Sequence, residues 1–129
     1  MLALRNPSEA YRRIDFDARV EGADPTALVL LCYEALSTAL GSALFAAERA
    51  DNRGKSAAIT RALSAVTALQ MGVRGEDAVA GALRQFLEAT RRQLLDNAIA
   101  FDPQGIAALR QDFEDIRSAL AGNAGARAA

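Results

Sequence analysis

The stretch "ADPTALVLLCYEALSTAL", residues 23–40, decides the fold class of this chain. It opens with Asp24-Pro25, in which the aspartate side chain can accept from free backbone N–H groups at a helix start. Proline fits the next position, which needs no N–H donor. The seven residues that follow Thr26 are all apolar, although a surface helix needs only about three or four apolar positions per two turns. The stretch therefore predicts a helix from residue 25 that carries more apolar surface than one core requires.

The same start signal occurs at the two other prolines of the chain, Asn6-Pro7 and Asp102-Pro103. Behind Asn6, Glu9 stands where the acid of a capping box is expected. The sequence thus predicts helix starts near residues 7, 25 and 103.

Apolar residues recur with helical spacing between these starts. The helix from residue 25 is expected to reach about residue 50, where "DNRG" breaks it, and a second to run from 56 to about 73. "GVRGED" marks the next turn, with Glu76 and Asp77 suited to a helix N-terminus, and Gly122 is a C-cap signal for the last helix. The expected core positions are Leu28, Val29, Cys32, Leu36, Leu40, Ala43, Ala47, Ile59, Ala62, Leu63, Val66, Leu69, Val73, Val79, Leu83, Phe86, Thr90, Leu94, Phe101, Ile106, Leu109, Phe113, Ile116 and Leu120.

No stretch alternates with the period of a β-strand, and short links favour antiparallel neighbours. The sequence therefore predicts an all-α fold, an antiparallel up-down four-helix bundle with a short N-terminal helical cap. The expected division is a cap over residues 1–22, the bundle over 23–122 and a disordered tail over 123–129.

The composition argues against an enzyme. The chain has no histidine, which removes the commonest general base and metal ligand and every Ser-His or Cys-His pair. No glycine-rich phosphate loop is present, and Cys32 on the apolar face is expected to be a small buried residue. We expect no catalytic residue, no cofactor and no metal.

Charge and hydropathy also exclude classes of partner. A net charge of −1 gives no basic footprint for nucleic acid. The first residues, "MLALRNPSE", lack the features of a signal peptide, and the longest apolar run is far below the ~20 residues that span a bilayer. A single cysteine cannot form an internal disulfide. The expected location is the cytoplasm, without membrane insertion.

Some apolar side chains fall off the core stripes. Leu30 lies at the margin of the first long stripe, and Leu31 and Phe45 lie outside it. Leu95 and Ile99 are off the third stripe, spaced i, i+4. Because the first and third helices of an up-down bundle run parallel, Phe45, Leu95 and Ile99 are expected toward one end.

Two interpretations of this surplus remain open. The core could simply be wide, with an N-terminal segment (Tyr11, Ile14, Ala18) covering the remainder. Alternatively, the surplus forms a groove for a partner helix, since exposed apolar strips of this kind mark interaction sites. The two are compatible if a partner displaces the segment. The expected partner-binding residues are Tyr11, Ile14, Leu30, Leu31, Phe45, Leu95 and Ile99.

The order of several motifs resembles the FliS family of flagellin-specific secretion chaperones. The matching features are Ala10-Tyr11, the Asp24-Pro25 helix start, the apolar run that ends in "CYEA" at residues 32–35, and "RRQLLDNAIAFDP" at residues 91–103. Tyrosines that the family carries in its third long helix are replaced by Phe86, Leu87 and Ala89, and its terminal Trp is absent.

The resemblance implies a cytoplasmic chaperone that holds the C-terminal helical region of flagellin, blocks premature polymerisation and delivers it to the cytoplasmic domain of the flagellar export gate. The same groove could pair two copies weakly as a homodimer. The alternative function is a helical-bundle adaptor or regulator that sequesters another amphipathic client, for example a transcription regulator.

Overall fold

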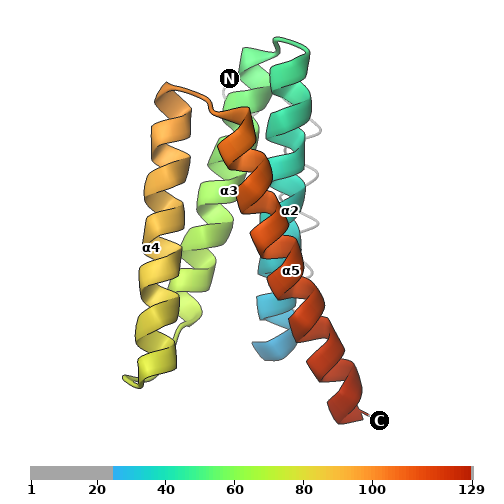
Figure 1. Ribbon diagram of the computed structural model, residues 1–129, viewed down its shortest axis with the longest axis vertical. Helices are drawn as coiled ribbons and strands as arrows, with labels where there is room; N and C mark the ends of the chain where they lie inside the picture. Colours follow the sequence, from blue (N-terminus) through green and yellow to red (C-terminus); the bar gives the residue numbers. More distant parts are fainter. Residues whose placement is uncertain (1–24, 129) are drawn as a thin grey trace, which may run out of the picture.

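The computed structural model describes residues 25–128, which form four helices. These are α2 (Pro25–Glu48), α3 (Asn52–Gly72), α4 (Ala78–Ile99) and α5 (Pro103–Ala128). They run alternately up and down (Figure 1), so the predicted all-α four-helix bundle is confirmed. The expected N-terminal cap, with Tyr11 and Ile14, lies outside the described residues.

The four helices do not pack as a closed square in which each helix contacts two neighbours to the same extent. α3 packs against both α2 and α4, while α5 packs against α2. In Figure 1, α5 crosses in front of the bundle and diverges from α4 toward the end at which α4 begins. α2 is therefore covered on two sides, whereas α4 packs mainly against one neighbour.

The helix starts follow the expected chemistry, with one correction. α2 and α5 begin at Pro25 and Pro103, and α4 follows Asp77, whose carboxylate accepts from the N–H of Ala80 at 2.8 Å. The predicted end of the first long helix near residue 50 is confirmed, because α2 ends at Glu48, but the predicted start of the next helix at residue 56 is wrong, because α3 begins at Asn52. Ala50, at φ 54°, turns the chain, and Asp51 accepts from the N–H of Gly54 at 2.9 Å. A link of three residues, 49–51, that ends in the cap Asp51 thus replaces the longer expected loop.

The predicted end of α5 at Gly122 is also wrong, because the helix continues to Ala128. Glycine inside a helix costs only about 1 kcal/mol relative to alanine. No proline follows Gly122, and alanines, the strongest helix formers, surround it. The residues that we expected to form a disordered tail are therefore helical over 123–128.

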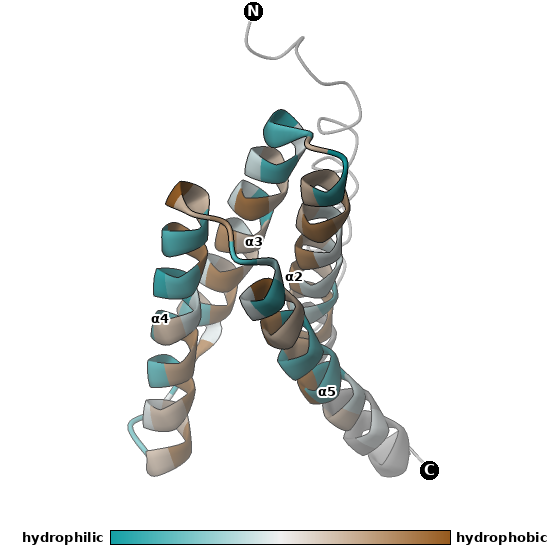
Figure 2. Cartoon of the chain, turned by 45° about the horizontal axis from the view of Figure 1, so that its top comes forward, coloured by the Kyte–Doolittle hydropathy of each residue, from teal (hydrophilic) through white to brown (hydrophobic). Residues whose placement is uncertain are grey.

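The core is built mainly from α2, α3 and α5. Phe113 is fully buried, and its ring centroid lies 5.6 Å from that of Tyr33 and 5.3 Å from that of Phe86. Figure 2 shows hydrophilic residues at the α2–α3 link and along the outer side of α4. The other core residues include Leu36, Leu40, Ala43, Ile59, Ala62, Val66, Leu69, Leu87, Leu94, Ile106 and Leu109.

Two expected core positions lie at the surface instead. Val79 is 78% exposed and Val29 is 37% exposed. On α4 the buried positions are Ala80, Leu87, Thr90, Leu94 and Asn97. At the start of α4, the buried face is therefore one residue further along than the predicted stripe. Small Ala80 faces the core, where it allows closer packing than Val79.

Candidate partner-binding surfaces

The packing of α2 accounts for part of its apolar surplus. Leu31 is buried, and Leu30 is half-buried. Leu31 is not one of the residues of the core cluster, so its predicted position off the core stripe is confirmed, but it is buried and not exposed as a groove residue would be. Tyr33, on the same helix, is buried against Phe113 of α5.

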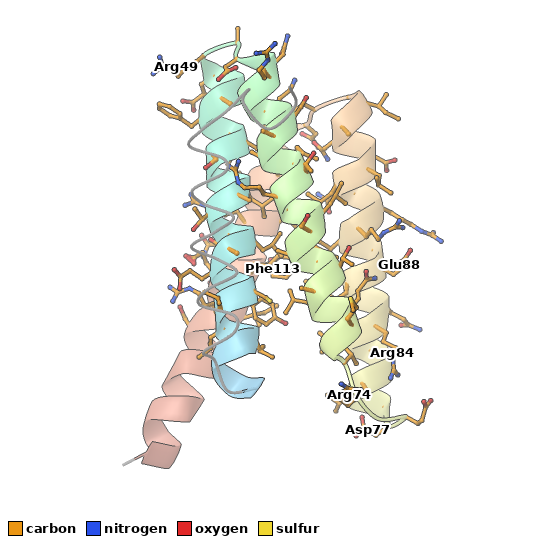
Figure 3. The ribbon with its side chains drawn as sticks, turned by 180° about the vertical axis from the view of Figure 1, so that it is seen from behind. Arg49, Arg74, Asp77, Arg84, Glu88 and Phe113 are labelled. Atoms are coloured by element: carbon orange, nitrogen blue, oxygen red, sulfur yellow. The ribbon has the colours of Figure 1, made fainter. Side chains whose placement is uncertain are left out.

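Phe45 remains exposed on α2, at 58%. The guanidinium carbon of Arg49 lies 5.2 Å from the centre of its ring, within the range of a cation–π contact. In Figure 3, Arg49 lies at the outer edge of the bundle, on the side of α2 away from α4. Phe45 therefore belongs to a surface of α2.

Leu95 and Ile99 form a separate exposed pair on the last turns of α4, with exposures of 41% and 90%. Since α2 and α4 run parallel, they lie toward the same end as Phe45, as expected (Figure 1). However, α3 lies between α2 and α4 in the packing order. The structure does not bring Phe45 together with Leu95 and Ile99 in one strip.

A rigid corner supports the Leu95–Ile99 pair. Buried Asn97 accepts from the backbone N–H of Asp102 at 2.6 Å and donates to the carbonyl of Gln93 at 2.8 Å. The side chain of Gln93 in turn donates to the carbonyl of Gly105 at 3.2 Å. These hydrogen bonds connect the end of α4 to the start of α5, so they hold in place the helical turn that carries Leu95 and Ile99.

The opposite end of the bundle carries apolar side chains that the sequence did not single out as partner-binding. Met71, at the end of α3, is 75% exposed, and Val79, at the start of α4, is 78% exposed. Polar contacts brace this end, because Arg84 donates to the carbonyl of Gly75 and Gln70 donates to Glu88 at 3.1 Å (Figure 3). The only signal in the sequence was the position of both residues beside the α3–α4 turn.

The described residues offer little for catalysis. They contain no group of three or more Cys, Asp or Glu side chains placed to hold a metal ion. Burial raises the pKa of the Cys32 thiol. Burial, and secondly the charge of Cys32, raise the pKa of Tyr33. Both groups are therefore neutral at physiological pH.

α2 contains the one described stretch, Val29–Glu48, that is long and apolar enough to cross a membrane. Half of that window is buried against the rest of the chain. The central helix of a bundle has the same composition, since it is covered on more than one side. The stretch is weak support for a membrane span.

A family model described as "Flagellar protein FliS" matches residues 7–125. The chain belongs to the FliS family. The FliS family consists of chaperones of flagellar secretion and is not a family of enzymes. The resemblance inferred from the motifs is thereby confirmed. No curated protein and no solved structure matches the chain.

Proposed function

We propose that this FliS-family chain is a cytoplasmic export chaperone for flagellin. In this proposal it binds the C-terminal helical segment of flagellin, prevents premature polymerisation and delivers its client to the cytoplasmic domain of the flagellar export gate. The family supports the chaperone role. The observation that carries the binding step is the exposed pair Leu95 and Ile99, spaced i, i+4 on a hydrogen-bonded corner.

The physical mechanism is burial of an assembly-prone helix face. An amphipathic helix places anchors at i, i+3, i+4 and i+7 in an apolar groove. A chaperone that covers such a face lowers the concentration of free client by mass action. Tyr11 and Ile14, in the segment 1–22, would cover the same surface until a client displaces them. Weak pairing of two chains through this surface is the competing reaction.

Isothermal titration calorimetry with a synthetic peptide from the C-terminal region of flagellin tests the proposal. We expect one peptide per chain and a negative heat-capacity change, because apolar surface is buried and the peptide folds as it binds. Leu95→Asp and Ile99→Asp should each weaken binding, because a charge in an apolar contact must be left unpaired or hydrated. Neither should shift the melting temperature, since both side chains are exposed.

Val79→Asp is the matched control, because Val79 is as exposed as Ile99 but lies at the other end of α4. Binding that survives in the Leu95 and Ile99 variants and is lost in the Val79 variant would move the client to the α3–α4 end. Leu31→Asp is expected to unfold the bundle, because Leu31 is buried.

The alternative client, such as a transcription regulator, is tested by a pull-down from the cytosol of a flagellated host. Mass spectrometry should find flagellin as the main captured protein. Capture without flagellin would contradict the proposed function.

A further inference from the structure

An open trough of about 590 Å³ runs along the outer face of α2, between α3 and α5. Small residues form its floor, namely Gly41, Ser42 and Ala46 of α2 with Gly54 and Ala57 of α3. Along α2 it extends from Thr38 to Arg49, which is about three helical turns or ~16 Å. We refer to this surface as the α2 trough.

Three arginines from separate parts of the chain surround the α2 trough: Arg49 directly after α2, Arg61 on α3 and Arg110 on α5. Arg110 reaches across α2, and its Nε donates to the carbonyl of Ser37 at 3.2 Å. Its guanidinium lies about 3.0 Å from where a Cβ on Gly41 would stand. The glycine thus gives Arg110 room to lie flat over the helix.

The described lining of the α2 trough holds one carboxylate, that of Asp51. This carboxylate already accepts from the N–H of Gly54 at the start of α3. The lining of the trough therefore has three guanidinium groups and one carboxylate, so positive charge is in excess there. Guanidinium groups bind carboxylates in well-defined two-bond geometries.

We propose that the α2 trough docks an acidic helix of a partner protein. Arg110 covers Gly41 and Asp51 covers Gly54, but the small residues Ser42 and Ala57 let a docked helix approach closely. Carboxylates along the flanks of that helix would pair with the arginines. The length of about three turns fits one such helix. This site lies on α2 with Phe45 and is separate from the Leu95–Ile99 surface, so it goes beyond the proposed function.

The test uses the full-length chain and a defined probe, a fluorescein-labelled helical peptide of about 14 residues. The probe carries alanine on one face and glutamate along both flanks, and its control has glutamine in place of every glutamate. Fluorescence anisotropy should show binding of the glutamate peptide that weakens with added salt. The glutamine peptide should bind at least about tenfold more weakly, since its ion pairs are lost.

Variants locate the site. Arg49→Glu and Arg61→Glu should each weaken binding about tenfold, whereas Arg92→Glu should leave it unchanged. Arg92 is exposed on α4, outside the trough, and its replacement changes the net charge equally. Ser42→Trp should block the trough without a change of charge, and Ser64→Trp, exposed elsewhere on α3, should not.

Three results would overturn the proposal. They are no binding of the glutamate peptide to the full chain, equal binding of the glutamine peptide, and equal losses in Arg92→Glu and in the trough variants. Equal losses in Arg92→Glu and in the trough variants would show that the peptide is attracted to positive charge anywhere on the surface and not to a defined site. Retained binding in Ser42→Trp would show that the probe lies outside the trough.

Discussion

Phe113 joins three helices, because its ring on α5 contacts Tyr33 of α2 and Phe86 of α4. Since it is fully buried, Phe113→Ala should lower the free energy of unfolding by about 3–5 kcal/mol. Phe45→Ala is the matched control, because Phe45 is the same residue type but exposed; its loss should stay below about 1 kcal/mol. Urea unfolding of both variants measures the difference, and equal losses would place Phe113 outside the core.

Cys32 and Tyr33 should make the stability of the bundle fall at alkaline pH. Burial raises the pKa of both groups in the folded state. Their contribution is therefore complete below the unfolded pKa, which starts from 9.0 for the thiol, and is lost as the pH rises through the folded pKa. Urea unfolding between about pH 7 and pH 10.5 should show this decline.

Cys32→Ala separates the two groups. It should flatten the alkaline decline while lowering stability at neutral pH through the small cavity that it leaves. An unchanged decline in this variant would assign the pH dependence to Tyr33 alone.

Periodicity predicted the residues at the centre of each stripe, among them Leu36, Leu94 and Phe113. It failed at the margins, where Leu31 is buried and Val79 is exposed. A marginal residue is buried or exposed according to which neighbour covers its side of the helix, and that depends on packing between distant segments. The α2 trough was missed for the same reason, because its three arginines come from segments far apart in the chain.

At the scale of helices, Asp77 determines where α4 begins. Its Oδ1 accepts from the N–H of Ala80 at 2.8 Å. Asp77→Ala should cost about 1 kcal/mol of stability, whereas Asp77→Asn should be nearly neutral because asparagine caps equally well. Thermal unfolding of both variants gives the comparison. A loss of equal size in both would mean that the charge of Asp77, and not its hydrogen bond, stabilises the helix.

Helix boundaries were predicted most closely where a capping side chain marks them. A start is marked by a side chain that accepts from specific N–H groups, as at Asp77, and the unpredicted cap at Asp51 obeys the same rule. An end marked by glycine alone is weaker, because Gly122 lies within α5. Without a proline behind it, glycine permits a stop but does not require one.

Across the whole molecule, the uneven packing of α4 should produce uneven protection from hydrogen exchange. Residues 78–85 are mostly exposed, with Ala80 the one buried side chain among them. Their amides should exchange much faster than those of residues 87–97 and of the middle of α2, because few buried contacts oppose local opening. Mass spectrometry after deuterium labelling reads the two halves of α4 separately. Equal protection of both halves would contradict this account.

The bundle class followed from the sequence, but the order of its helices did not. Short links make successive helices neighbours, which explains the α2–α3 and α3–α4 contacts. The α2–α5 contact joins segments far apart in the chain and depends on side chains such as Tyr33 and Phe113 fitting together. That fit is a property of three-dimensional shape, which periodicity does not describe.

The up-down arrangement has a mechanical consequence. α2 starts and α5 finishes at the same end of the molecule (Figure 1), and these two helices pack against each other. A force that pulls these two helix ends apart would break the contacts between α2 and α5 one after another, beginning at that end. Sliding the helices lengthwise past each other would instead strain all the contacts together. The bundle should therefore open under a smaller force in this direction than in the lengthwise direction.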